Sequence, residues 1–108
     1  MLSFSPKTPA TKRAYGMDFY KKCALSGSTV SSAVASVLVA SGVDANPAAL
    51  LSGGVSLSNG ATNVQTMVSQ TLLGGIPGVV YVLKIVATCS DGQILEGQAQ
   101  LPVVTLLP

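Results

Sequence analysis

The sequence predicts an all-β protein, a single antiparallel β-sandwich of about seven strands with an extended N-terminal arm. Three observations support this fold class. Apolar and polar residues alternate with period two from Thr29 onward, β-branched residues are frequent in the alternating stretches, and turn residues separate these stretches at short intervals. We therefore expect residues 1–16 to form the arm and residues 17–108 to form one sandwich domain, a length sufficient for a single modest core.

The arm is predicted from its prolines and its charge. Ser5 to Arg13 contains two prolines and no apolar periodicity, and proline favours extended backbone at its own position and before it. Five of the six Lys and Arg residues, but only one of the four acids, lie within the first 22 residues. Three interpretations follow: a frayed terminus, a tether that orders against a neighbouring subunit, or a nucleic-acid contact.

The residues expected to make a tether's contacts are Lys7, Lys12, Arg13 and Tyr15. Nucleic acid is the least favoured partner, because binding it would need more clustered basic residues and more stacking than Tyr15 and Phe19 supply. The arm lacks the apolar run of a signal peptide, and no stretch reaches the roughly 18 apolar residues of a membrane span. We therefore expect synthesis in the cytosol and no membrane partner.

Six strands are expected after the arm. They are Met17–Leu25, Val30–Ala40, Gly54–Ser58, Asn63–Leu73, Val79–Cys89 and Ile94–Val103. The second of these could also be a helix of small residues, but its valines are β-branched and no capping pattern encloses it, which favours a strand. One helical turn is expected after Pro47, because proline suits the first helical position.

The last two strands form a predicted hairpin whose turn contains Asp91 and Gly92, an acid that caps turns and a residue that tolerates positive φ. Lys84 and Glu96 fall on outward faces of this hairpin and are expected to pair. Tyr81 follows a glycine-rich corner at the start of a long strand, as in the tyrosine corner of sandwich domains, so its hydroxyl should bond to upstream backbone.

Two segments of the chain, Gly78–Leu83 and Ala87–Gly92, resemble bacterial and phage immunoglobulin-like or fibronectin type III-like domains. The whole chain also resembles small virion proteins of tailed bacteriophages. Three features carry this second resemblance: the leader Phe4–Lys7, the pair Asp18–Phe19, and Gly42–Pro47 ahead of Leu50–Gly53. The resemblance implies an immunoglobulin-like fold and a structural part of the particle, with no catalytic residues to carry over.

Composition disfavours catalysis. The chain has no His and four acids, so the commonest base and metal ligand is missing, and no cofactor or metal is expected. The two cysteines, Cys23 and Cys89, lack the spacing of a zinc site. Cytosolic synthesis favours two thiols over a disulfide between them, although a disulfide remains the alternative.

Charged residues make up only 9% of the chain, against about 25% in ordinary soluble domains, which suits a surface packed against other protein. We therefore expect a homo-oligomer or symmetric array whose partners are the major capsid protein or other virion subunits. The leading hypothesis is a capsid decoration or cement protein, located in the virion, that docks through its arm. The alternatives are a neck or fibre-base component, or a carbohydrate- or receptor-binding module that uses loops such as Ser58–Asn63.

Overall fold

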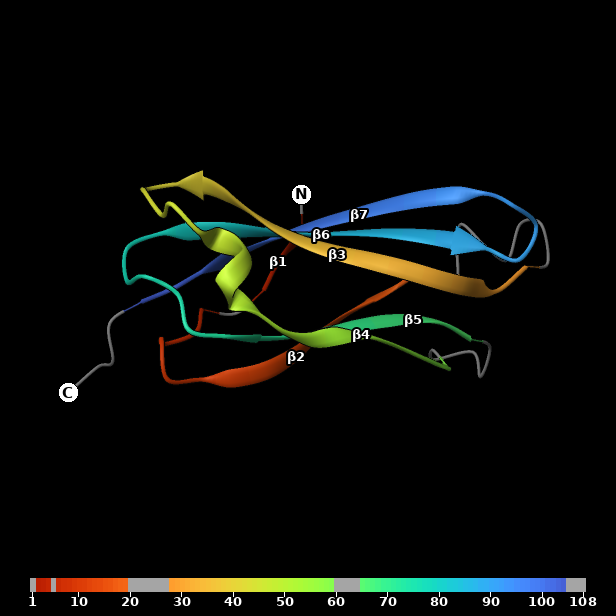
Figure 1. Cartoon of the computed structure of the whole chain (residues 1–108), viewed down its shortest axis with the longest axis horizontal. Helices are drawn as coiled ribbons and strands as arrows, with labels where there is room; N and C mark the ends of the chain where they lie inside the picture. The colour runs from red at the N-terminus through yellow and green to blue at the C-terminus, as the bar shows by residue number, and fades with distance from the viewer. Residues whose placement is uncertain (1, 5, 20–27, 60–64, 105–108) are drawn as a thin grey trace.

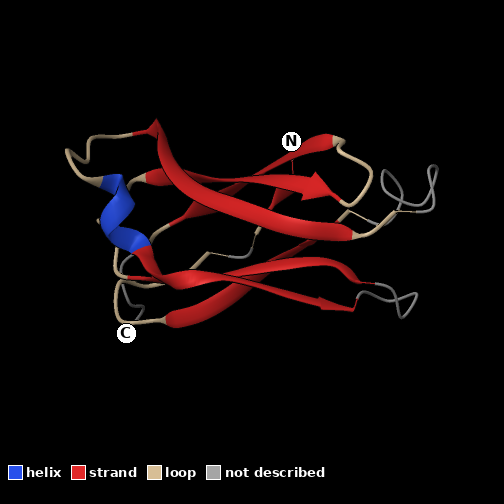
Figure 2. Ribbon diagram, turned by 45° about the vertical axis from the view of Figure 1, so that its right-hand side comes forward, coloured by secondary structure: helices blue, strands red, loops and turns tan. Residues whose placement is uncertain are grey.

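The computed structural model describes residues 2–4, 6–19, 28–59 and 65–104 of the 108-residue chain. Its strands lie in two layers packed face to face, with a short helix at one end (Figures 1 and 2). The elements are β1 Leu2–Ser3, β2 Lys12–Asp18, β3 Val30–Ser41, the 3-10 helix η1 Pro47–Leu50, β4 Leu51–Asn59, β5 Gln65–Leu73, β6 Val80–Cys89 and β7 Ile94–Pro102.

The predicted β-sandwich is confirmed. One sheet has the strand order β1-β7-β6-β3 and the other has the order β2-β5-β4. All neighbouring strands are antiparallel except β1 and β7, which pair in parallel. This parallel pair is the one departure from the expected pattern within the described sheets.

Period-two alternation places the core between the sheets, as the sequence predicts. In β6 the inward positions Tyr81, Leu83, Ile85, Ala87 and Cys89 are all buried. In β5 the buried face includes two polar residues, Thr66 and Gln70. Their side chains are hydrogen-bonded, Thr66 to the Asp18 carboxylate and Gln70 to backbone carbonyls, which makes their burial tolerable.

The expected free arm is not what the structure contains. The leader lies along β7 of its own chain, where the Phe4 N–H donates to the Gln100 carbonyl (2.8 Å) and the Lys7 N–H donates to the Pro102 carbonyl (3.1 Å). The Val104 N–H returns a bond to the Lys7 carbonyl (2.8 Å). The leader therefore supplies an edge to the sandwich, and its removal should destabilise the fold.

The boundary expected between residues 16 and 17 also falls inside a strand. β2 starts at Lys12, and its buried positions Tyr15 and Met17 alternate with exposed ones, so this short segment already has the period of a strand. The high density of charge and of small residues before Tyr15 obscured that period in the sequence. The expected strand Met17–Leu25 thus begins earlier, and residues 20–25 lie outside the described residues.

The other elements agree with expectation to within a few residues. The helical turn after Pro47 is η1, and Val30–Ser41 is a strand. β4 is longer than predicted because a register shift between Ser52 and Ser56 bulges the strand, and Gly53 within the bulge has φ of 73°. Cys89 is buried, and Cys23 lies outside the described residues, so two thiols stay the prediction and a disulfide between them stays the alternative.

Candidate interaction surfaces

The loop between β5 and β6 is fixed by Tyr81. Its buried hydroxyl accepts a hydrogen bond from the Ile76 N–H (2.9 Å) and donates one to the Asp44 carboxylate (2.7 Å). The upstream backbone bond is the one expected of a tyrosine corner. The other oxygen of Asp44 accepts the Asn46 N–H (2.9 Å), which caps the turn, and nothing in the sequence indicated the bond between Asp44 and Tyr81.

These contacts shift the pKa values of both groups. The hydrogen bond from Tyr81, followed by that from the Asn46 N–H, lowers the pKa of Asp44. Burial, followed by the bond to Asp44, raises the pKa of Tyr81. At neutral pH both shifts favour a neutral Tyr81 phenol that donates to an ionised Asp44 carboxylate. The role of this corner is therefore structural.

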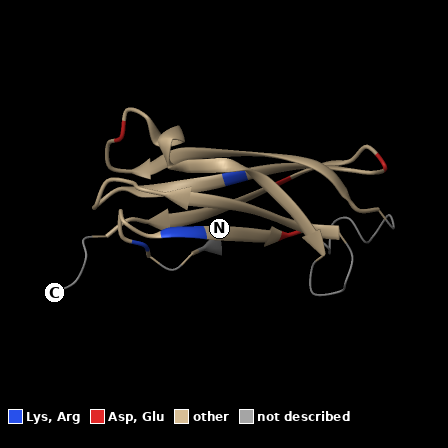
Figure 3. Cartoon of the chain, turned by 60° about the horizontal axis from the view of Figure 1, so that its bottom comes forward, with Lys and Arg blue, Asp and Glu red and all other residues tan. Residues whose placement is uncertain are grey.

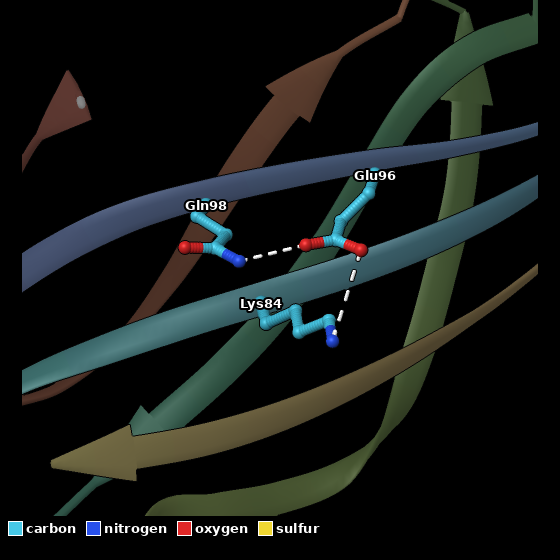
Figure 4. A network of polar contacts seen from close by, with 3 residues as sticks. All are labelled: Lys84, Glu96 and Gln98. Atoms are coloured by element: carbon cyan, nitrogen blue, oxygen red, sulfur yellow. Dashed lines mark hydrogen bonds and ion pairs between the residues drawn. The ribbon is translucent and has the colours of Figure 1, made fainter.

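The β6–β7 hairpin is also held by local contacts. In its turn, Asp91 accepts the Gln93 N–H (3.1 Å), and Gly92 has φ of 92°, a conformation that L side chains rarely adopt. On the outer face, the ammonium of Lys84 lies 3.7 Å from the carboxylate of Glu96, which also accepts a bond from Gln98 (Figure 4). The expected Lys84–Glu96 pair is therefore present, in a partly exposed setting that limits its contribution to stability.

Two of the four residues expected to contact a partner are buried. Lys7 is only 3% exposed, and its ammonium donates to the carbonyls of Thr8 and Gly74. Burial lowers the pKa of Lys7 and raises that of Tyr15, whose ring packs on Phe4 with centroids 4.7 Å apart. Lys7 and Tyr15 therefore hold the leader to the sandwich.

Lys12 and Arg13, in contrast, are exposed at the start of β2. Lys12 lies opposite Leu73 in the β2–β5 register, and Leu73 leads into the loop that Tyr81 and Lys7 hold. Exposed apolar side chains gather at this end of the sandwich: Val43, Leu73, Ile76 and Val104. We call these four residues, with Lys12 and Arg13, the basic end. The same end also holds one acid, Asp44, whose carboxylate is hydrogen-bonded to Tyr81 and to the Asn46 N–H.

The opposite end of the sandwich carries acidic groups. β2 runs from Lys12 to Asp18, so its basic start and its acidic finish lie at opposite ends of one strand. β6 likewise runs from the Tyr81 corner toward the Asp91 turn. We call the region of Asp18 and Asp91 the acidic end. Within the described ranges, charge is sparse between these ends apart from the Lys84–Glu96 pair (Figure 3).

The sequence of the chain matches a known family. A family model described as Podophage GP4 fiber-tail adaptor protein gp77 matches residues 7–102. The chain belongs to this adaptor family. No curated protein and no solved structure matches it. Membership makes the chain a structural protein of the bacteriophage virion, in agreement with the resemblance noted from its sequence.

The adaptor family changes the order of the functional hypotheses. A fibre-tail adaptor fits the expected alternative, a neck or fibre-base component, better than the leading hypothesis of capsid decoration. It likewise points to virion subunits as partners without singling out the major capsid protein. The family is a structural one, in line with the composition of the chain, which offers little for catalysis.

Other site types find no support in the described part of this adaptor-family chain. Tyr15, Phe19 and Tyr81 are buried, so none of them forms an aromatic platform for a glycan. The loop Ser58–Asn63, named above for glycan binding, lies mostly outside the described residues. Among the residues described, no three His, Cys, Asp or Glu side chains could hold a metal, and no helix could span a membrane.

Sequence reasoning missed the apolar half of the basic end. Val43, Ile76 and Val104 lie in irregular segments, where period-two alternation gives no information about burial. The sequence held only a local sign of this surface, namely apolar residues placed among glycines and prolines in segments too short to form strands. Exposure of such residues marks an interaction surface only once the fold shows that several gather at one end.

Proposed function

We propose that this protein is an adaptor that joins two different virion subunits, one at each end of its sandwich. Family membership supports an adaptor role, and the observation that carries the two-ended arrangement is the polarity of the charge. Lys12 and Arg13 begin β2, and Asp18 ends it. An adaptor must distinguish two partners, and the opposite charges at the two ends of β2 provide that distinction.

The basic end suits a partner with an apolar contact surrounded by acidic groups. Val43, Leu73 and Ile76 are apolar and exposed, and the rim beside them carries the charge of Lys12 and Arg13. Apolar centres with charged rims are the usual anatomy of protein interfaces, with Arg enriched. The Tyr81 corner and the Lys7 contacts hold this surface rigid, which lowers the entropic cost of binding.

The acidic end would meet a second, basic partner. Asp91 sits in a tight turn whose Gln93 N–H bond fixes the carboxylate. Asp18 is held by the Thr66 hydroxyl at 2.7 Å. Carboxylates positioned in this way steer association through their charge more than they add affinity. The partners we propose for the two ends are therefore tail and fibre subunits.

We also assign the sandwich to the immunoglobulin-like class. Naming β2 to β7 as strands B to G gives the sheet orders B-E-D and C-F-G, which are those of an immunoglobulin constant-type sandwich apart from the first strand: β1 lies beside G here, whereas strand A of that sandwich lies beside B. The Tyr81 hydroxyl bond to the Ile76 N–H supports the same assignment. A solved structure of the chain whose strand order differed from this one would overturn it.

The two-ended arrangement is tested by separating the two contacts. In phage that depend on a supplied copy of this protein, we would replace it by the double variant Lys12→Glu/Arg13→Glu or by Asp91→Asn. Asparagine keeps an oxygen to accept the Gln93 N–H and removes only the charge. The composition of purified particles and subcomplexes is then measured by mass spectrometry.

Each variant should weaken attachment of a different neighbouring subunit. The basic-end variant should lose one partner while retaining the other, and the acidic-end variant should show the reverse, with a smaller effect at higher salt because salt screens the charges that the variants alter. A decoration protein with one docking face would instead respond to only one variant, or lose all attachment with it. That result would contradict the two-ended adaptor. Far-UV circular dichroism confirms that both variants fold.

A further inference from the structure

The longest strand of the sandwich is an unprotected sheet edge. β3 spans Val30–Ser41 and pairs only with β6 among the described strands. Its pairing is continuous from Ser32 to Val39, with register shifts only at its two ends. Edge strands usually carry a charge, a proline or a bulge that blocks further pairing, and this stretch has none of them.

The other long edge, β4, is protected in the usual way. Its register shift between Ser52 and Ser56 interrupts the edge, and the Gln70 amide donates to the carbonyls of Ser52 and Gly53. Those carbonyls are therefore occupied from within the chain. The contrast leaves β3 as the edge that can accept another strand.

The sequence of β3 is complementary to itself. Residues 32–36 read Ser-Ala-Val-Ala-Ser, a palindrome centred on Val34. In an antiparallel pair of two such strands, Val34 would lie opposite its copy, Ala33 opposite Ala35, and Ser32 opposite Ser36. Each row would join identical small residue types across the two-fold axis, so no row sets a large side chain against a small one or places a charge at the axis.

We propose that the protein forms a two-fold dimer in which the β3 strands of two copies pair edge to edge, centred on Val34. The occupant of the edge is thus a second copy of this chain. The two four-stranded sheets would become one continuous sheet of twice the width. The observations behind this inference are separate from those behind the proposed adaptor contacts.

Charge placement permits such a dimer. A two-fold axis brings each residue on it against its own copy, so a charge there would meet a like charge. The nearest charges on the outer face are Lys84, opposite Ser36, and Glu96, opposite Val86, which itself pairs with Val34. Across the axis two Lys84 side chains would be three strand spacings apart, about 14 Å, and two Glu96 side chains five spacings, about 24 Å, both beyond the screening length of about 8 Å at physiological salt.

Shape on the inner side permits it as well. A shallow groove of about 230 Å³ runs beside the edge, lined by Ala33, Val34, Ala35, Leu51, Gly53, Gly54, Val55 and Gln70. A Cβ placed on Gly53 or Gly54 would meet no atom within 4 Å, so this side of the groove is open. The approaching strand would present Ala33 and Ala35 to it, two small side chains that fit beneath a sheet edge.

Substitutions at Val34 test the axis directly. Val34 is 70% exposed, so Val34→Lys and Val34→Glu should fold as the wild type does. The wild type should sediment as a dimer, and each variant alone should sediment at half that mass. An equimolar mixture of the two variants should regain the dimer mass, because the introduced ammonium then faces the introduced carboxylate across the axis, and high salt should weaken that mixed dimer.

Ile94 provides the matched control. It is also 70% exposed, on the outer face of the same sheet but two strands from the edge, so Ile94→Lys should keep the dimer mass. A wild type that is monomeric would overturn the proposal. Failure of the mixed variants to pair, or an equal effect of Ile94→Lys, would also overturn it.

Cross-linking gives a second readout that does not depend on charged variants. In a Cys23→Ser background, Val34→Cys should form a disulfide-linked dimer on mild oxidation, because residues directly opposite in an antiparallel pair have Cα atoms about 4.5–5.5 Å apart. Ile94→Cys in the same background should not. Covalent dimer from both, or from neither, would contradict the β3 pairing.

Discussion

Replacing Tyr81 by Phe removes one oxygen from the centre of the corner that holds the basic end. Tyr81 is fully buried, and its hydroxyl serves the Ile76 N–H and the Asp44 carboxylate at once. Phenylalanine fills the same space without that oxygen. The variant therefore changes hydrogen bonding with little change in packing volume, which makes the result straightforward to interpret.

The magnitude follows from the groups left behind. The Ile76 N–H loses its acceptor in a partly buried loop, and such a loss costs about 1–2 kcal/mol of the free energy of unfolding. For a domain of this size, 1 kcal/mol corresponds to about 4–8 °C in Tm. We therefore expect Tyr81→Phe to unfold about 5–15 °C below the wild type at pH 7.

The dependence of stability on pH separates the contribution of the Tyr81–Asp44 hydrogen bond from that of the Tyr81–Ile76 hydrogen bond. The bond from Tyr81 lowers the pKa of Asp44 below its ordinary value of 3.8, so the stabilisation is present above that value and is lost as pH falls through the folded-state pKa. The pKa of Tyr81 is raised above 10.0, so the wild type also loses stability above pH 10 as the unfolded phenol ionises. The difference in the free energy of unfolding between wild type and Tyr81→Phe should therefore be largest at pH values between these two acid and alkaline ranges.

The assay is urea unfolding monitored by far-UV circular dichroism, since the chain has no Trp. The midpoint should fall in the variant at pH 7 while the m-value stays constant. At pH 3 the gap should narrow but persist, because the Ile76 bond does not titrate. A variant as stable as the wild type at pH 7, or a gap independent of pH, would refute the role given to the Tyr81–Asp44 pair.

Two further predictions concern the same end of the molecule. Gly75→Ala should lower the free energy of unfolding by about 2 kcal/mol or more, because φ is 109° and the added Cβ would lie 2.8 Å from a Val103 methyl. Gly78→Ala should cost less, because its φ is 89° but no atom lies near the added Cβ. Thermal melts compare the two variants. Lys7→Met should destabilise far more than Lys12→Met in the same assay, because only Lys7 is buried and bonded to backbone carbonyls. Since burial lowers the folded-state pKa of Lys7, the wild type should gain stability relative to Lys7→Met as pH rises toward 10.5, and a flat difference would contradict that shift.

The strands were predictable because the alternation that marks a strand lies within a short stretch of the sequence. β6 alternates over most of its ten residues, with Val82 the one buried residue on its outer face, so both its span and its buried face follow from period two. β2 was harder to recognise, because Lys12 and Arg13 gave the segment the composition of a solvated arm. Its membership of the sandwich depends on Tyr15 and Met17 finding a buried surface that distant residues provide.

The interaction surfaces were less predictable because they join residues far apart in the sequence. Lys7 and the Gly74 carbonyl, like Asp44 and Tyr81, meet only through the fold. No pattern in the sequence relates such pairs, so Lys7 read as an exposed contact residue when it is a buried anchor. Only Lys12 and Arg13 keep the exposed position that the sequence suggested.

The two proposals together constrain when each contact forms. Pairing about an axis at Val34 makes the β3 strands antiparallel, so the basic end of one copy lies at the same side as the acidic end of the other. Such a dimer has no polarity along its strands, whereas an adaptor between two different subunits needs one. The dimer is therefore a form that precedes attachment, and Val34→Lys should enter particles at least as well as the wild type. Poorer incorporation of a folded Val34→Lys would show instead that the paired form is the one that attaches.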